Sequence, residues 1–501
     1  MSTTLILSTL NARYMHTAFG LRYLYANLGS LQEQAKILEF TIQELPINIV
    51  ERLLAENPKI IGFSVYIWNV AEINKVVSML KQIAPEVIII LGGPEVSHHP
   101  DVPPVTDLAD YVISGAGEVS LSKLCSEILS GEYPKTKFIK GHIAPLDEIA
   151  LPYDYYSDED IRTRLIYVEA SRGCPFKCEF CLSALDKSVT AFPLTPFFES
   201  MENLLQRGVR NFKFIDRTFN LKVSTSVAIL EFFLEHMTED LYLHFEVVPD
   251  NLPEKLKEVL KRFPKNSLQF EIGVQTFDSE IQDLISRKQN NEKTKANISW
   301  LRENTGAHLH TDLIFGLPSD TLENFGHSFD QLIALNPHEI QMGILKRLRG
   351  APLNRHNESY QLKYNPEAPY NILMTQDITF NEMQRVNRFA RYWDMIGNSG
   401  RFMNTLPIIL ADEPFKHFMQ LSDSLFELAG STWKIALKRL FELMFNIITQ
   451  QFGFEADEVK KYLALDYQRT KLKGIPSYEQ VVPSLKAGKQ GTANKRQLMH
   501  D

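Results

Sequence analysis

The chain has 501 residues, of which 44% are hydrophobic and 23% charged. These values are close to the averages of globular proteins and exclude a largely disordered or fibrous chain. The length predicts two or three domains. Because the formal net charge is -8, the chain as a whole does not attract phosphate backbones, and nucleic acid is not an expected partner.

The first sixteen residues, MSTTLILSTLNARYMH, lack the basic start and long apolar run of a secretory signal. No later segment reaches membrane-spanning length. Three of the four cysteines fall within eight positions, which suits a metal site better than a disulfide framework. We therefore expect a cytoplasmic protein that makes no membrane contact.

Five short apolar runs alternate with candidate helices over residues 1–135. The runs are TLILSTL, AKILEF, KIIGFSVY, EVIIILGGPE and DYVISGAGE. Runs that are apolar on both faces are typical of a parallel sheet covered by helices on each side. The pattern predicts an α/β domain with a doubly wound, Rossmann-like sheet, and such sheets bind ligands at the carboxyl ends of their strands.

Residues 136–160 are irregular and are expected to form a linker. Six further strand-helix units follow over residues 161–352, which predicts a partial (β/α)6 barrel of the TIM type with its chemistry at the strand ends. Residues 353–482 carry helical periodicity and predict a helical C-terminal domain. Residues 483–501 are polar and basic and are expected to be a disordered tail.

The strongest motif is SRGCPFKCEFC, directly after the first strand of the second series. It spaces Cys174, Cys178 and Cys181 as CxxxCxxC, so that each thiolate can bind a different iron of one four-iron four-sulfur cluster. Three ligands leave one iron open. That iron can chelate the amino and carboxylate groups of S-adenosylmethionine, and one electron can then cleave the sulfonium bond.

The alternative for these cysteines is a structural zinc site. Tetrahedral zinc needs a fourth Cys or His, usually from a second pair, and the sequence has no second pair. Cys125 lies in an amphipathic segment of the first domain, where a buried, inert thiol is expected. The spacing therefore favours a 4Fe-4S cluster.

The motif CPFKCEFC resembles that of the radical S-adenosylmethionine (radical SAM) superfamily, and the resemblance extends over the six strand-helix units. It implies contacts to the cofactor from residues of the motif and of the segments FKFIDRTFN, FEIGVQTFD and TDLIFGLP: Phe180, Asp216, Glu271, Gln275, Ile314 and Gly316. The alternative for Phe180 is a loop anchor, and for the polar residues a capping role. Arg287 and Lys288 are expected to be solvated, with a contact to the methionyl carboxylate as their alternative.

The first domain resembles the cobalamin-binding domain that often precedes such barrels. The matching residues are Ser64, Gly92, Gly93, Gly115, Gly117 and Glu118. Small residues there let a corrin or its nucleotide tail approach the backbone closely. The DxHxxG pattern that supplies an axial histidine is absent, because Tyr14 stands where Asp would support His16. We therefore expect cobalamin to bind without His16 as a ligand.

The resemblance implies an enzyme that reductively cleaves S-adenosylmethionine at the cluster to start radical chemistry. With cobalamin, methyl transfer to an unactivated carbon is the expected reaction, and a reductant such as flavodoxin or ferredoxin is the expected partner. The alternatives are radical chemistry without cobalamin and a non-catalytic iron-sulfur electron carrier. The helical region resembles an uncharacterised domain through NRFARYWDMIGNSGRF. The substrate is not indicated.

Overall fold

The computed structural model describes residues 3–186, 188–470 and 472. They divide into two compact units. The first contains Met1–Asp216, Lys346–Asn354 and Asn365–Asn371, and the second contains Arg217–Leu345, Arg355–Tyr364 and Ile372–Asp501. The predicted tail, 483–501, lies outside the described residues.

The first unit is built on a six-stranded parallel sheet with the strand order β2-β1-β3-β4-β5-β6. Its strands are β1 (Leu5–Asn11), β2 (Ala35–Thr41), β3 (Ile60–Ser64), β4 (Ile88–Gly92), β5 (Tyr111–Ser114) and β6 (Phe138–Lys140). The connecting helices are α1 (Phe19–Ala26), α2 (Pro46–Leu54), α3 (Val70–Ile83), α4 (Val105–Leu108) and α5 (Glu118–Ser130).

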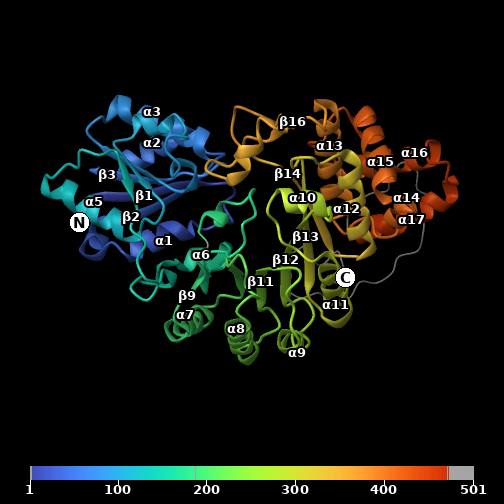
Figure 1. The fold of residues 1–501 in the computed structure, drawn as a ribbon, viewed down its shortest axis with the longest axis horizontal. Helices are drawn as coiled ribbons and strands as arrows, with labels where there is room; N and C mark the ends of the chain where they lie inside the picture. The colour runs from blue at the N-terminus through green and yellow to red at the C-terminus, as the bar shows by residue number, and fades with distance from the viewer. Residues whose placement is uncertain (1–2, 187, 471, 473–501) are drawn as a thin grey trace. The chain divides into compact units, whose positions relative to one another are not determined.

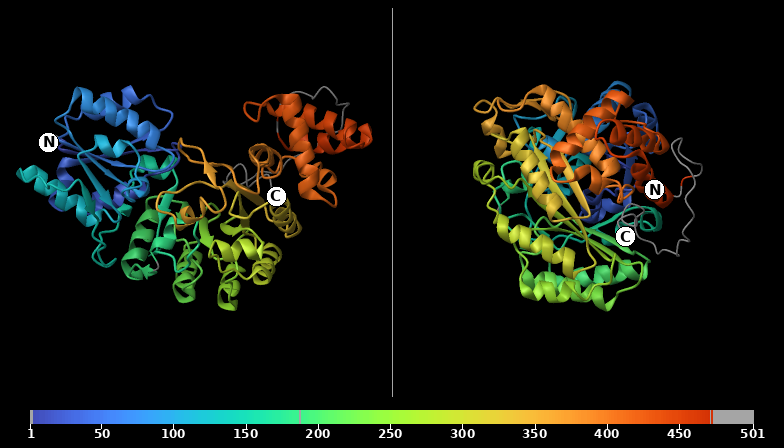
Figure 2. Two further views of the ribbon diagram at one scale, coloured as in Figure 1. Left: turned by 45° about the horizontal axis from the view of Figure 1, so that its top comes forward. Right: turned by 90° about the vertical axis from the view of Figure 1, so that its right-hand side faces the viewer.

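Alternating side chains of these strands enter two separate cores. Ile61 and Leu91 pack with apolar residues of α2 and α3, whereas Ile60 and Ile90 pack with those of α1 and α5. Successive strand residues point to opposite faces, so both faces of the sheet are buried. Figures 1 and 2 show the two helix pairs on opposite sides of the strands. This is the predicted doubly wound domain.

The segment expected to be an irregular linker contains regular structure. Strand β6 pairs with β5 and adds an edge to the first sheet. Helix α6 (Asp158–Thr163) begins at a capping box, in which the Ser157 side chain accepts from the backbone of Asp160 and the Asp160 side chain accepts from that of Ser157. Elements of three and six residues are too short to give a clear period.

All six strands predicted for the second series are present. They are β7 (Ile166–Val168), β10 (Asn211–Phe214), β11 (Tyr242–Val247), β12 (Leu268–Gln275), β13 (His308–Phe315) and β14 (Glu339–Ile344). The strand order is β10-β7 in the first unit and β14-β13-β12-β11 in the second. Strands β7 and β10 pair in the first unit, and β11 to β14 pair in parallel in the second.

Helices follow these strands as a strand-helix repeat requires. They are α7 (Leu194–Gln206), α8 (Val223–Glu235), α9 (Glu254–Leu260), α10 (Ser279–Leu284), α11 (Asn291–Asn304) and α12 (Leu322–Ala334). On β11 and β12 the buried side chains Phe245 and Phe270 alternate with the partly exposed Glu246 and Glu271. The two glutamates are register partners and therefore share the face opposite the apolar side chains.

The C-terminal part of the second unit is helical, as expected (Figure 2, orange to red). It contains α13 (Phe380–Ile396), α14 (Leu406–Leu410), α15 (Pro414–Ala429), α16 (Leu437–Gln450) and α17 (Ala456–Arg469), preceded by the short pair β15 (Lys363–Tyr364) and β16 (Ile372–Met374). The side chains of Phe389, Trp393 and Ile396 on α13 are buried and form part of its core. The ring of Trp393 packs edge-on against Phe329 of α12 at 4.8 Å.

Candidate functional site

The three clustered cysteines lie on one loop of the first unit. It runs from β8 (Ser171–Arg172) to β9 (Thr190–Ala191), which pair antiparallel. The Cys181 amide donates to the Cys178 carbonyl at 3.0 Å, and the Cys174 amide donates to the carbonyl of Asp186 at 3.4 Å. All three cysteines are partly exposed. The loop is therefore closed at its base and presents its thiols at an accessible surface.

The donor set suits a cubane cluster, because three thiols on one short loop can each bind a different iron. Cys125 is fully buried, and burial raises the pKa of its thiol to about 12, as an inert thiol requires.

Asp216 anchors the start of the cysteine loop. Its carboxylate accepts from the Ala170 amide at 3.0 Å and from the Ser171 hydroxyl at 2.6 Å. The side chain is buried, and burial raises the pKa of Asp216 to about 7 against the opposing effect of these hydrogen bonds. A contact between Asp216 and S-adenosylmethionine stays a prediction.

Gly173 sets the turn that leads into Cys174. Its φ is +92°, and a Cβ there would lie 1.7 Å from the carbonyl oxygen of Ser188. Only glycine combines this left-handed backbone with so close an approach. On the far side of the motif, the Leu353 amide donates to the Glu179 carbonyl at 2.9 Å. The loop is thus held at both ends of the cysteine motif.

The first unit also contains a cavity of about 690 Å³ between its sheet and helices α1 and α5. Its walls include all six residues predicted from the resemblance to cobalamin-binding domains: Ser64, Gly92, Gly93, Gly115, Gly117 and Glu118. The floor is formed by Leu7, Gly62 and Ile90, which are register partners across β1, β3 and β4. The fold therefore brings the predicted set together at one site.

Two neighbouring glycines shape the floor in different ways. Gly93 has a φ of +103°, and a Cβ there would lie 2.6 Å from the backbone oxygen of Val65. A Cβ on Gly92 would meet no atom closer than 3.9 Å. Gly93 is therefore required by the backbone, while Gly92 leaves space for a ligand. The cavity thus suits a flat group that approaches the strand ends closely.

His16 lines the same cavity. Its Nδ1 lies 2.6 Å from the hydroxyl of Tyr167, so this imidazole contacts a phenol and not the carboxylate of the DxHxxG pattern. Burial, followed by the charges of Lys213, Arg13 and Arg164, lowers the pKa of His16. Tyr14 donates instead to Glu159 at 2.7 Å. The partner was missed because it lies 151 positions away in the sequence.

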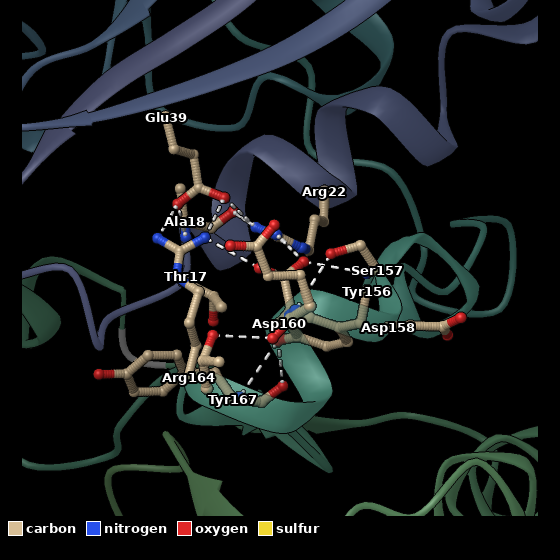
Figure 3. Close-up of polar contacts among 12 residues, drawn as sticks. Thr17, Ala18, Arg22, Glu39, Tyr156, Ser157, Asp158, Asp160, Arg164 and Tyr167 are labelled. Atoms are coloured by element: carbon tan, nitrogen blue, oxygen red, sulfur yellow. Dashed lines mark hydrogen bonds and ion pairs between the residues drawn. The ribbon is translucent and has the colours of Figure 1, made fainter.

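A buried ion-pair network joins Arg22, Glu39, Asp160 and Arg164 (Figure 3). Arg22 contacts Glu39 and Asp160, each at 2.7 Å, and Arg164 contacts the same two carboxylates, each at 2.9 Å. Arg164 also donates to the His16 carbonyl at 2.6 Å. Burial alone would raise the pKa of Glu39, but Arg22 and Arg164 hold it below its usual value. The network joins α1, β2 and α6.

A second polar cluster faces the cavity next to the cysteine loop. Arg172 donates from Nη1 to Glu118 at 2.6 Å and from Nε and Nη2 to Glu169 at 2.9 and 2.8 Å. Its guanidinium lies 4.5 Å from the ring centre of Tyr23. All four side chains line the cavity. The sequence analysis named only Glu118; the position of Arg172, two residues before Cys174, was the available signal.

The remaining predicted cofactor residues divide between the units. Phe180, partly exposed, lies in the first unit, and Glu271, Gln275, Ile314 and Gly316 lie in the second. Glu271 contacts His244 at 2.9 Å. Gly316, with a φ of +91°, packs against Ile372, so that a Cβ would lie 2.7 Å from its Cγ2. Their contacts with the cofactor stay predictions.

Gln275 occupies an irregularity in β12. The register with β13 shifts between Gly273 and Gln275, and Gln275 has a φ of +69°, a conformation that is uncommon outside glycine and clusters at functional sites. Arg287 donates to the Gly273 carbonyl at this bulge. Arg287 is partly buried rather than solvated, which corrects the expectation, while Lys288 is exposed, as expected.

Comparison with known proteins agrees with both parts of this site. Residues 7–124 match the B12 binding domain family, residues 168–332 match the radical SAM superfamily, and residues 358–496 match a family described as a protein of unknown function (DUF4080). The chain contains a radical SAM domain and, before it, a B12-binding domain. The two resemblances that the sequence indicated, to radical SAM proteins and to cobalamin-binding domains, are thereby confirmed.

One curated relative of this chain is the cobalamin-dependent radical SAM methyltransferase TokK from Streptomyces tokunonensis. The two are 23% identical over 373 residues, which cover 66% of this chain and 52% of TokK. The chain thus spans about half the length of that relative. The match is consistent with both predicted domains.

Two solved structures share the fold. The radical SAM methyltransferase TsrM from Kitasatospora setae, solved with cobalamin and a [4Fe-4S] cluster, is 17% identical, with a TM-score of 0.59 over 72% of this chain and 78% of TsrM. The cobalamin-dependent S-adenosylmethionine radical enzyme OxsB is 13% identical, with a TM-score of 0.60 over 93% of this chain and 80% of OxsB. These likenesses confirm the predicted fold class.

The domain matches also confirm the predicted cofactor classes, namely a 4Fe-4S cluster, S-adenosylmethionine and cobalamin. A zinc site and a simple electron carrier find no support in them. No helix among the described residues is long and apolar enough to cross a bilayer.

Proposed function

We propose that this protein is a cobalamin-dependent radical SAM enzyme that transfers a methyl group to an unactivated carbon. The observation that carries the proposal is the cavity of the first unit, which gathers all six predicted cobalamin-contacting residues. Arg172 lines that cavity and lies two residues before the first cysteine of the cluster motif. Radical chemistry without cobalamin would leave such a cavity without a purpose.

The chain's residues divide the work of holding the cofactors. Cys174, Cys178 and Cys181 would hold three irons and leave one open for S-adenosylmethionine. Ser64 and the neighbouring glycines would bind the nucleotide tail of cobalamin through close backbone approach. When bound, the cluster would supply the electron for reductive cleavage of S-adenosylmethionine, and cobalamin would supply methyl-transfer chemistry.

The finer assignments belong to the same proposal. Phe180 and Asp216 in the first unit, and Glu271, Gln275, Ile314 and Gly316 in the second, are the proposed contacts to S-adenosylmethionine. A low-potential donor such as flavodoxin or ferredoxin would supply the electron, and the cytoplasm would supply the reducing conditions. The domain limits of 1–135, 161–352 and 353–482 are likewise proposed.

The experiment is anaerobic reconstitution of the full chain with iron, sulfide and hydroxocobalamin, followed by incubation with S-adenosylmethionine and a strong reductant. We expect deoxyadenosine and methionine to form in wild type and not in Cys178→Ala. Cys125→Ala is the matched control and is expected to behave as wild type. Failure of the reconstituted wild type to cleave S-adenosylmethionine would contradict the proposal.

A further inference from the structure

Arg172 is the side chain that connects the cavity wall to the cysteine loop within the first unit. Its three guanidinium donors reach Glu118 at the start of α5 and Glu169 after β7, at distances between 2.6 and 2.9 Å. A guanidinium presents its donors in a fixed planar fork. Two carboxylates bound to it therefore fix its orientation as well as balance its charge. Burial raises the pKa of Glu169, although the positive charge of Arg172 acts in the opposite direction.

The guanidinium is also fixed from the side by aromatic rings. It lies 4.5 Å from the ring centre of Tyr23 on α1 and 5.4 Å from that of Phe192. Tyr23, Glu118, Glu169 and Arg172 all line the cavity. Any ligand that fills this end of the cavity therefore meets the side chains that determine where Arg172 lies.

The backbone of Arg172 leaves little freedom between this cluster and the first cysteine. Arg172 pairs with Thr190 and Ser171 pairs with Ala191, and the Ser171 hydroxyl is bound to Asp216 at 2.6 Å. Gly173 follows in a left-handed turn against Ser188. A shift of the Arg172 side chain is therefore transmitted to Cys174 rather than absorbed by a flexible segment.

We propose that Arg172 is a positioning residue that couples occupancy of the cobalamin cavity to the geometry of the cysteine loop. This inference rests on the proposed function. The carboxamide side chains of a corrin complement the Glu118-Arg172-Glu169 cluster, because amides both donate and accept hydrogen bonds. Coupling is reciprocal. The assembled 4Fe-4S cluster therefore strengthens cobalamin binding as much as bound cobalamin orders the cysteine loop around the 4Fe-4S cluster.

The test is a binding cycle on the full chain. The dissociation constant of hydroxocobalamin is measured by anaerobic equilibrium dialysis, with cobalt quantified, before and after removal of the cluster by chelation. In wild type we expect cobalamin to bind about fivefold or more tightly when the cluster is present. In Arg172→Lys, which keeps the charge but not the fork, we expect the ratio to fall to near unity.

Arg349→Lys is the matched control. Arg349 also contacts two carboxylates, Glu95 at 2.8 Å and Asp101 at 2.5 Å, and stacks on Tyr370 at 5.1 Å, but it does not line the cavity. Its ratio should equal that of wild type. Glu118→Gln removes one charged partner of Arg172 and provides a second variant should Arg172→Lys fail to fold; its ratio should also fall.

The outcomes separate the coupling from the proposed function. Equal affinity in the two forms of wild type, or an unchanged ratio in whichever of the two cavity variants fold, would overturn the coupling while leaving cobalamin binding intact. If the wild type binds no hydroxocobalamin in either form, the proposed cobalamin dependence itself is overturned. A purely structural role for Arg172 would weaken binding equally in both forms and leave the ratio as in wild type.

Discussion

The hydroxyl of Tyr167 lies 2.6 Å from Nδ1 of His16, on the wall of the cobalamin cavity. The hydroxyl can donate to Nδ1 or accept from it, depending on the imidazole tautomer. When Tyr167 donates, Nε2 keeps the imidazole proton and cannot bind cobalt, whereas a carboxylate in this place would accept from Nδ1 and leave Nε2 free to bind it. We expect the first arrangement, and with it cobalamin binding without a histidine ligand.

The first prediction is that His16→Ala retains cobalamin. After reconstitution with hydroxocobalamin and desalting, the variant should hold as much cobalt as wild type and show the same visible spectrum, because no Co–N bond to His16 is lost. Tyr167→Phe, which frees Nδ1, is the companion variant. Loss of cobalt in His16→Ala, or loss of a nitrogen splitting from the EPR spectrum of the reduced cobalamin that the variant retains, would identify His16 as a ligand.

The cysteine loop gives the second prediction. Alanine at Cys174, Cys178 or Cys181 should each abolish the oxygen-sensitive cluster, because three thiolates are needed to hold a cubane with one open iron. Cys125→Ala should keep its iron, since that thiol is fully buried with a pKa raised to about 12. Iron content and the visible absorbance of the cluster measure both. Iron loss in Cys125→Ala alone would contradict the assignment.

The adjacent glycines of the cavity floor, Gly92 and Gly93, give the third prediction. Gly92→Leu should leave the thermal midpoint of unfolding close to that of wild type. It should weaken cobalamin binding about tenfold or more, because the leucine side chain occupies ligand space on the face of the sheet that also carries Ile90. Gly93→Ala should instead destabilise the fold by about 2 kcal/mol or more, since its Cβ meets the Val65 backbone. Calorimetry and dialysis distinguish the two. Unchanged cobalamin affinity in Gly92→Leu would place the ligand elsewhere.

Much of this architecture could be predicted from the sequence. The apolar runs located all the long strands, and CxxxCxxC located the loop, because both patterns are local in sequence. The resemblance located the residues of the cavity, as Ser64 and Glu118 show. Interactions across long separations could not be predicted: Arg22 reaches Asp160 over 138 positions and His16 reaches Tyr167 over 151. Such pairs exist only once β1, α1 and α6 have packed.

Short elements were missed for a different reason. Strand β6 has three residues and gains its stability by pairing with β5 rather than from its own pattern. Arg287 was expected to be solvated because it follows a strand in a polar segment, whereas it binds the carbonyl of Gly273 that the bulge in β12 leaves available. Bulges are set by packing between strands, which a single sequence does not reveal.

The fourth prediction concerns Asp216 and pH. Its folded-state pKa is raised to about 7 from 3.8, so the folded chain holds a proton that the unfolded chain releases between about pH 4 and pH 7. The free energy of unfolding should therefore fall as pH rises through this window, on the order of 1.4 kcal/mol per pKa unit. Asp216→Asn, which keeps an acceptor oxygen, should flatten this fall.

The measurement is the urea concentration at the midpoint of unfolding of the cluster-free chain. Unfolding is monitored by circular dichroism at about pH 5 and at about pH 7. The Asp216→Asn variant should lose less stability between the two than wild type. Asp457→Asn is the control, because that side chain is 98% exposed, and its profile should follow wild type. A wild-type chain that gains stability over this interval, with an identical gain in Asp216→Asn, would refute the pH argument.

The central claim is that one chain holds both a 4Fe-4S cluster and cobalamin. Elemental analysis after anaerobic reconstitution with iron, sulfide and hydroxocobalamin, followed by desalting, tests it most directly. The account predicts about four iron atoms and one cobalt atom per chain, with cobalt reduced in Gly92→Leu and iron lost in Cys178→Ala. Iron retention without any cobalt in wild type would contradict it and leave a radical SAM protein that does not use cobalamin.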